Sequence, residues 1–207
     1  MGHVITIAQQ KGGSGKTTIA ANLAVAYAKA GKRVALLDTD PQGSLGRWCM
    51  TRFQSGTEDM DFATASAWGV TYECDKLRKT HDIIIIDTPP KIDSDLKPAL
   101  RESDLVIVPV AASQLDLWAT ESILDMAQRE DKGILVVLNR AKSGTRVADE
   151  VAKDLKKLDA PVAKTVLGNR VAFAETLGHG KGVLEGGRGA SPAEVTALAK
   201  EVTKRLK

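Results

Sequence analysis

The stretch Lys11-Gly12-Gly13-Ser14-Gly15-Lys16-Thr17-Thr18 decides the fold that this sequence predicts. It follows the apolar run at residues 4–8 and precedes the alanine-rich segment 19–30, which is the order strand, turn, helix. Its three glycines let the backbone curl so that successive N–H groups point inward, and the helix N-terminus behind them adds positive partial charge. The stretch therefore predicts a cradle for phosphate groups.

Each residue of this phosphate loop has an expected role. Lys16 is expected to reach the β- and γ-phosphates of a nucleotide, and the hydroxyl of Thr17 is expected to ligate magnesium. A glycine-rich turn that carries two lysines by accident is the alternative, but strand, loop and helix agree with the context that the motif requires. The predicted nucleotide-binding residues of the loop are Gly12, Gly13, Ser14, Gly15, Lys16, Thr17 and Thr18.

Two further predicted strands end in acidic residues. The apolar segment 33–37 leads into Asp38-Thr39-Asp40-Pro41-Gln42, and the four isoleucines at 83–86 lead into Asp87-Thr88-Pro89-Pro90. Four consecutive isoleucines fit a strand that is covered on both faces, and open α/β sheets bind ligands at the carboxyl ends of their strands. Aspartates beside a triphosphate would repel it, so magnesium is expected between them; turn-forming aspartates are the alternative reading.

The loop departs from the usual phosphate-binding pattern, because Gln10 stands where that pattern has a glycine and Lys11 comes next. Lys11-Gly-Gly-x-Gly-Lys-Thr-Thr resembles the "deviant" Walker A loop of the ParA/MinD class of ATPases. The Asp-x-Asp-Pro-Gln motif at 38–42 and the segment 105–120 resemble the same family. The resemblance covers nearly the whole chain, and it is to short ParA-type partition ATPases without an N-terminal helix-turn-helix extension.

The resemblance assigns roles to individual residues. It implies that Lys11 reaches across a nucleotide-sandwich dimer to the partner's phosphates and acts in catalysis together with Lys16. It implies that Asp40 positions or activates the attacking water and that Asn139 contacts adenine, although a turn asparagine is the alternative there. The predicted metal residues are Thr17, Asp38 and Asp87, and the predicted switch II residues are Thr88, Pro89 and Pro90.

The resemblance also implies a fold and an activity. The expected fold is a single α/β P-loop NTPase domain over residues 1–207, with a mainly parallel twisted sheet of seven or eight strands and helices on both faces. The expected activity is hydrolysis of ATP with Mg²⁺, slow without dimerisation and a partner. The ATP-bound homodimer would bind nucleoid DNA without sequence preference, and a ParB-like adaptor would stimulate hydrolysis. The cargo would be a plasmid, a chromosome region or a large protein assembly.

The C-terminal part of the chain is its basic part. Residues 164–207 hold eight of the 29 lysines and arginines but four of the 26 aspartates and glutamates. Such side chains could neutralise DNA phosphates without reading bases, although charged helix faces are often only solvated. The candidates for DNA binding are Arg170, Lys181, Arg188, Lys200, Lys204, Arg205 and Lys207.

Local patterns predict several further elements. Residues 161–167 are expected to form the last strand, and the glycines within 178–190 are expected to make a mobile loop. Ser191 is expected to cap the final helix, whose apolar stripe should pack on the domain. Asp116 is expected to cap an earlier helix, with Trp118 on its packed side.

Composition and the weaker patterns leave some alternatives open. The two isolated cysteines suggest reduced thiols rather than a metal site or disulfide, and no apolar run predicts a signal peptide or a membrane span. We therefore expect a cytoplasmic, nucleoid-associated protein. A MinD-like membrane-associated ATPase and a metabolic phosphoryl-transfer enzyme on the same scaffold remain alternatives. Between residues 54 and 80 the pattern indicates only a short strand at 62–65 and a helix around 72–79.

Overall fold

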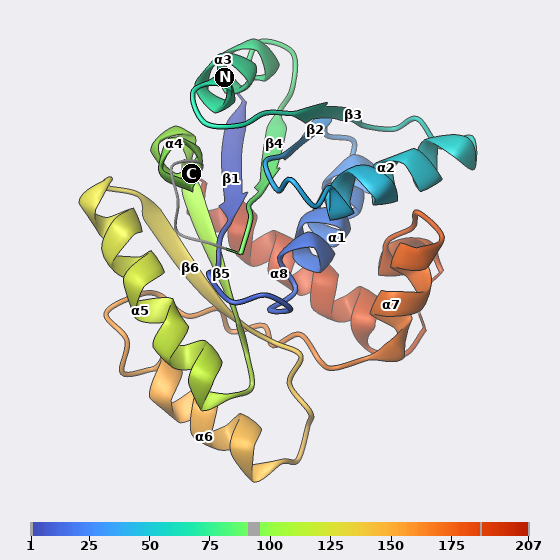
Figure 1. The fold of residues 1–207 in the computed structure, drawn as a ribbon. Coiled ribbons are helices and arrows are strands. Elements are labelled where there is room, and N and C mark those ends of the chain that lie inside the picture. The colour runs from blue at the N-terminus through green and yellow to red at the C-terminus, as the bar shows by residue number, and fades with distance from the viewer. Residues whose placement is uncertain (1, 91–95, 187, 207) are drawn as a thin grey trace.

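The computed structural model describes residues 2–90, 96–186 and 188–206, and in these segments six parallel strands form one sheet (Figure 1). The strand order across the sheet is β3-β2-β4-β1-β5-β6. Because every pair is parallel, each connection must cross a face of the sheet, and helices occupy these crossovers. The strands are β1 (His3–Ile7), β2 (Val34–Asp38), β3 (Asp61–Thr64), β4 (Ile83–Asp87), β5 (Leu105–Ala111) and β6 (Gly133–Asn139).

Helices cover both faces of the sheet, as the sequence predicted (Figure 1). One face carries α1 (Lys16–Lys29), α2 (Ser44–Gln54), α7 (Val171–Gly178), the short 3₁₀ helix η1 (Val183–Glu185) and α8 (Ser191–Arg205). The other face carries α3 (Gly69–Leu77), α4 (Leu96–Glu102), α5 (Gln114–Arg129) and α6 (Arg146–Leu155). The chain is thus an α/β fold with three layers.

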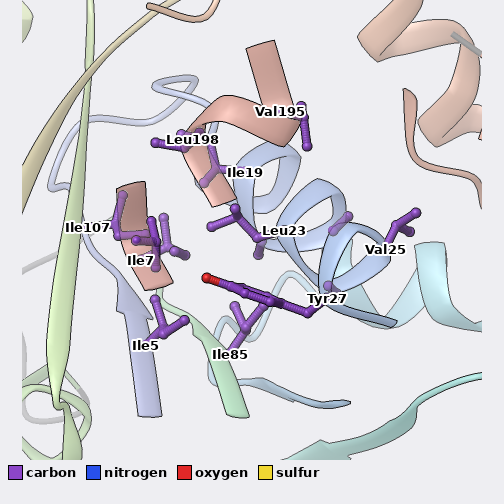
Figure 2. Packing of buried hydrophobic residues seen from close by; sticks show 14 of the residues in the cluster. Ile5, Ile7, Ile19, Leu23, Val25, Tyr27, Ile85, Ile107, Val195 and Leu198 are labelled. Atoms are coloured by element: carbon purple, nitrogen blue, oxygen red, sulfur yellow. The ribbon is translucent and has the colours of Figure 1, made fainter. Parts of the chain in front are cut away.

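The isoleucine run of β4 shows why the central strands are apolar throughout. Successive side chains of a strand point to opposite faces. Ile83 and Ile85 pack in the cluster under α1 and α8, whereas Ile84 and Ile86 pack in the cluster under α3 and α4. Figure 2 shows Ile85 packing with residues of β1 and α1. The prediction of a strand covered on both faces is confirmed.

The sheet has fewer strands among the described residues than the seven or eight predicted, and the segment 161–167 explains the difference. Among the described residues, this segment pairs with β6 through one isolated bridge, Val136 with Val162, and a second bridge, Ala141 with Gly168, lies just beyond the ends of both. Between these bridges the backbone N–H groups of Lys164 and Thr165 donate to the carboxylate of Glu201 instead of to a strand. A side chain from α8 therefore takes the hydrogen bonds that a seventh strand would need.

The prediction of a mobile loop over residues 178–190 is wrong for its first half. Val183 is buried, and its backbone N–H donates to the side chain of Asn22 in α1. The guanidinium of Arg52, which is only 1% exposed, donates to the carbonyl of Gly180 and to both carboxylate oxygens of Glu185. A buried arginine from α2 therefore holds this segment in place through hydrogen bonds and ion pairs. Gly180 lets the backbone of the segment approach the backbone of α2 closely, because a Cβ atom there would lie 2.4 Å from the backbone nitrogen of Arg52.

Three expectations about helix ends and faces are also corrected. Helix α5 is capped by Ser113, whose side chain accepts from the N–H of Asp116, so Asp116 lies inside the first turn. Trp118 is 64% exposed rather than packed. Ser191 is the first residue of α8, and no side chain caps this helix, because its N-cap residue is Ala190, which has no polar side chain. Glu194, inside the first turn, accepts instead from the backbone N–H of Gly168.

The remaining local predictions agree with the structure. The strand expected at 62–65 is β3, and the helix expected around 72–79 is α3, which begins and ends slightly earlier. Residues Val195, Leu198 and Val202 of α8 are buried in the main core cluster, so its apolar stripe packs on the domain. No helix of the described segments combines the length and apolar character that crossing a membrane requires.

Candidate nucleotide site

The carboxyl ends of three neighbouring strands lie together at one end of the sheet. In the parallel register, Asp87 at the end of β4 is the partner of both Ile7 at the end of β1 and Asp38 at the end of β2. The phosphate loop follows Ile7 directly, so tertiary structure places it beside both acids. Open parallel sheets bind their ligands at this end, beyond the carboxyl ends of their strands.

The glycines of the loop are required by its geometry. Gly13 and Gly15 have φ angles of 78° and 93°, in the left-handed region that favours glycine. A Cβ atom on Gly15 would lie 2.3 Å from Nδ2 of Asn139, so a side chain there would displace the Asn139 amide and would also be strained by the φ angle. Gly15 caps α1, and the first turn of this helix contains no acidic residue, so its N-terminal charge is available to an anion.

Two buried polar atoms at this point lack a protein partner. Thr17 donates from Oγ1 to Oδ2 of Asp87 at 2.6 Å, while Oδ1 of Asp87 and Oγ of Ser14 have no hydrogen-bond partner among the described residues. Burial raises the pKa of Asp87 to about 7; the Thr17 hydrogen bond opposes this rise, and the nearby Asp38 adds to it. Buried polar atoms are normally satisfied, so a ligand is expected here.

The donor set fits magnesium bound together with a nucleotide. A hydroxyl and a carboxylate with a free oxygen are the hard oxygen ligands that Mg²⁺ takes, and Mg²⁺ usually adds phosphate oxygens and waters to one or two carboxylates. Within the described segments no group of three or more His, Cys, Asp or Glu residues converges on a metal position. Thr17 and Asp87 would therefore hold the ion together with the nucleotide's own oxygens.

The side chain of Lys16, the first residue of α1, is buried against the residues that precede the loop. Its Nζ donates to the carbonyl of Gln9 at 3.0 Å. Burial lowers the pKa of Lys16, and the charges of Asp87 and Asp40 partly offset that effect. A phosphate group would add the negative charge that keeps this buried ammonium ionised.

The two aspartates after β2 differ in their surroundings. Asp38 is buried, and its two carboxylate oxygens accept from the backbone N–H groups of Asp40 and Gly46. Its hydrogen-bonding capacity is therefore used at the start of α2. Asp40 is half-buried, and its Oδ1 accepts from the N–H of Gln42. Their predicted roles in metal binding and water activation stay predictions.

The predicted switch II residues hold the ends of the central strands together. Thr88 donates from Oγ1 to the carbonyl of Ile7 at 2.8 Å, and Thr39 donates to the carbonyl of Asp87. Pro89 is buried beside them and Pro90 is half-buried. The residues that follow, 91–95, lie outside the described segments.

Lys11 is paired within its own chain. Its Nζ lies 2.5 Å from Oδ2 of Asp116 in α5; the Lys11 side chain is 38% exposed, and that of Asp116 is 5% exposed. The neighbouring Gln9 and Gln10 also bond to α5, through the hydroxyl groups of Thr120 and Ser122. The sequence analysis missed Asp116 as this partner. Its only signal was its position just after a strand that ends at the same sheet edge.

Asn139 joins the end of β6 to the loop. Its Nδ2 donates to the carbonyl of Ser14 at 2.7 Å, and its Oδ1 accepts from the N–H of Arg140 at 2.9 Å. Its contact with adenine stays a prediction. Arg140, which the sequence analysis did not single out, has a φ of 52°, a left-handed conformation that is uncommon for a residue with a side chain.

Three of the candidate DNA-binding residues line two different grooves. Arg170 is paired with the carboxylate of Glu194. Lys200 and Lys204 line a groove with His3 at the amino end of β1, which is the sheet edge opposite to the phosphate loop. The described candidates are all exposed at residue level, while Lys207 lies outside the described residues.

Comparison with known sequences identifies relatives along the whole chain. The profile of the CobQ/CobB/MinD/ParA nucleotide binding domain matches residues 5–183. The chain is 28% identical over 206 residues to "Maintenance of carboxysome distribution protein A" of Halothiobacillus neapolitanus, covering 96% of this chain and 95% of that protein. It is 30% identical over 252 residues to "Sporulation initiation inhibitor protein Soj" of Bacillus subtilis, covering 98% of each.

Comparison with solved structures gives the same fold. A plasmid partition protein from Borrelia burgdorferi, bound to AMPPNP, superposes with a TM-score of 0.84 at 20% identity and covers 99% of this chain and all of that one. The septum site-determining protein MinD from Pyrococcus horikoshii, complexed with Mg-ADP, superposes with a TM-score of 0.81 at 22% identity, with 99% and 97% covered. With the family profile spanning most of the chain and the loop in its required place, the protein belongs to the CobQ/CobB/MinD/ParA nucleotide-binding family.

Proposed function

We propose that this protein is a ParA-type ATPase that hydrolyses ATP to ADP and phosphate with Mg²⁺ and uses the cycle to position a cargo. The observation that carries the proposal is the Thr17–Asp87 pair, with its unpartnered carboxylate oxygen, directly beneath a left-handed glycine loop. The nucleotides bound to the partition protein and MinD named above support ATP and magnesium as the cofactors.

The residues of this chain can position a γ-phosphate for attack by water. Magnesium, when bound, neutralises charge on the phosphate oxygens, and Thr17 and Asp87 would hold it. Lys16 would exchange the carbonyl of Gln9 for the phosphates, while the loop N–H groups and the N-terminus of α1 stabilise the charge that develops. Asp40, whose charge acts on both Lys16 and Asp87, would orient the attacking water.

Lys11 makes the proposed turnover depend on assembly. In the homodimer its ammonium would leave Asp116 and reach the partner's phosphates, so an isolated subunit should hydrolyse ATP slowly. The test compares Lys11→Ala with Lys142→Ala, an exposed lysine outside the loop. Only the Lys11→Ala variant should lose both ATP-dependent dimerisation, measured by sedimentation, and phosphate release. Unchanged dimerisation and hydrolysis in that variant, or fast turnover by sedimenting monomers, would contradict the proposal.

We further propose that the ATP-bound dimer binds DNA without sequence preference through exposed cations of the C-terminal region. Salt should weaken this binding steeply, because counterions are released from the phosphates. Two double charge reversals distinguish the possible surfaces: Lys181→Glu with Arg188→Glu, and Lys200→Glu with Lys204→Glu at the opposite edge. If one double variant loses DNA affinity, its two residues lie on the DNA-binding surface. If both double variants keep full DNA affinity, these four residues are excluded.

A ParB-like adaptor that stimulates hydrolysis is the proposed protein partner, and the nucleoid is the proposed location. The relatives act, by their names, in carboxysome distribution and sporulation, and a solved neighbour is a plasmid partition protein, so a large assembly or a DNA region is the class of cargo. The variant Asp40→Ala should accumulate as an ATP-bound dimer. This variant is then used to capture proteins from an extract of the native host. If no protein binds to it in an ATP-dependent manner, the result would count against an adaptor.

A further inference from the structure

The residue after Asn139 lies against the phosphate loop. The Nη1 atom of Arg140 is 4.0 Å from the position of a Cβ atom on Gly13, and its Nε is 4.0 Å from that position on Gly15. The guanidinium therefore lies alongside the two glycines whose left-handed backbone shapes the loop. In the described part of the chain, no other side chain lies within 4 Å of both of these Cβ positions.

The backbone holds Arg140 in this place. Its N–H is bonded to the side chain of Asn139, and that side chain is bonded in turn to the carbonyl of Ser14. The end of β6 and the phosphate loop are thereby joined through one amide group. The left-handed conformation at Arg140 is unfavourable for a residue with a side chain, and such conformations concentrate at functional sites.

Among the described residues, no carboxylate forms an ion pair with Arg140. Its side chain is exposed, and none of the ion pairs of the described segments includes it, whereas Lys11 is paired with Asp116. Lys16 adds a second cation at the same loop, and the N-terminus of α1 adds positive partial charge. A guanidinium beside these groups is repelled by them until an anion binds between.

We propose that Arg140 is a nucleotide-contacting residue, whose guanidinium binds phosphate oxygens of the nucleotide held by the loop of its own subunit. This inference rests on the proposed nucleotide site and adds a residue to it. A polyphosphate supplies the missing negative charge, and the planar guanidinium can donate two parallel hydrogen bonds to phosphate oxygens. Bound phosphate would also offset the repulsion from Lys16.

The test measures binding of fluorescent MANT-ADP and MANT-ATP with magnesium to the full chain, at concentrations where sedimentation shows monomer. Arg140→Gly removes the side chain and accepts the left-handed backbone, so it avoids the strain of an alanine. Arg140→Lys keeps the charge but loses the two-bond geometry. Arg146→Ala is the matched control, since the side chain of that arginine is 91% exposed on α6 and forms an ion pair with Glu150 on the same helix.

Loss of a charge-assisted hydrogen bond should weaken both nucleotides about tenfold to a hundredfold in Arg140→Gly. Arg140→Lys should fall between, and Arg146→Ala should bind like the wild type. If wild-type protein binds and Arg140→Gly binds within twofold of it, Arg140 is not a nucleotide contact, and the nucleotide site stands. A loss that emerges only where dimers form would overturn the assignment to the same subunit. Wild-type protein that binds neither nucleotide would refute the nucleotide site itself.

Discussion

Replacing Arg52 by methionine should destabilise the protein strongly, although Arg52 lies outside the nucleotide site. Its side chain is 1% exposed, lies 5.4 Å from the ring centre of Trp48, and pairs with the carboxylates of Asp59 and Glu185. Removing one member of a buried ion pair costs about 3–5 kcal/mol, because the remaining charges lose their compensation. The two acids are 35% and 17% exposed and can regain water, so we expect about 3 kcal/mol.

For a chain of 207 residues, this loss corresponds to a decrease in melting temperature of about 6–12 °C. The assay is thermal unfolding at pH 7 without nucleotide, supported by urea unfolding at 25 °C. Arg47→Met is the matched control, because Arg47 is an exposed arginine on the same helix that takes part in no ion pair of the described segments. A decrease below about 2 °C in Arg52→Met, or an equal decrease in the control, would refute the reasoning.

The pH dependence provides a second check on the same ion pairs. Hydrogen bonds from Arg52 lower the pKa of Asp59; burial raises the pKa of Glu185, but hydrogen bonds from Arg52 and from the N–H of Gly182 outweigh it, so its pKa is also lowered. Carboxyl groups with lowered pKa stabilise the folded state above their unfolded pKa of about 4, and this stabilisation is lost as the pH falls further. The stability difference between wild type and Arg52→Met should therefore be full at pH 7 and shrink below about pH 4. A difference that grows between pH 7 and pH 4 would contradict this account.

Three further predictions follow from the structure. Asp116→Asn removes the charged partner of Lys11, and a part-exposed ion pair contributes up to about 1 kcal/mol. ATP-dependent dimers should therefore form at about fivefold lower protein concentration in sedimentation. Unchanged assembly would argue against a competition between Asp116 and the partner subunit's nucleotide for Lys11. Gly15→Ala should weaken MANT-ATP binding strongly, because alanine is strained at the left-handed φ of residue 15 and its Cβ would displace the Asn139 amide that holds the loop; unchanged affinity would contradict the loop geometry. Glu201→Gln should lower the free energy of unfolding, measured with urea, by about 1–2 kcal/mol, since its carboxylate accepts from two backbone N–H groups. An unchanged free energy of unfolding would show that water replaces these hydrogen bonds without loss of stability.

Local sequence was sufficient for the central strands and the phosphate loop. The four isoleucines at 83–86 predict a strand buried on both faces, and glycines 13 and 15 predict a left-handed turn, because both features depend on residues adjacent in the chain. The meeting of this loop with Asp87 also follows from sequence, once each acid is placed at the carboxyl end of a parallel strand. The six-stranded order confirms this placement among the described residues.

Tertiary structure decided the features that depend on contacts between distant segments. Residues 161–167 have the composition of a strand, but Glu201 captures two of their N–H groups. The glycines after residue 178 predict mobility, but Arg52 reaches them across 128 residues of sequence. The partner of Lys11 is Asp116, 105 residues away. Propensity and periodicity describe each segment's own preference, whereas these outcomes depend on which charged side chain the fold brings within hydrogen-bonding distance. The sequence by itself therefore determined the nucleotide fold, and the packing of the fold determined that, in the described part of the chain, Lys11 is ion-paired whereas Lys16 and Arg140 are in no ion pair.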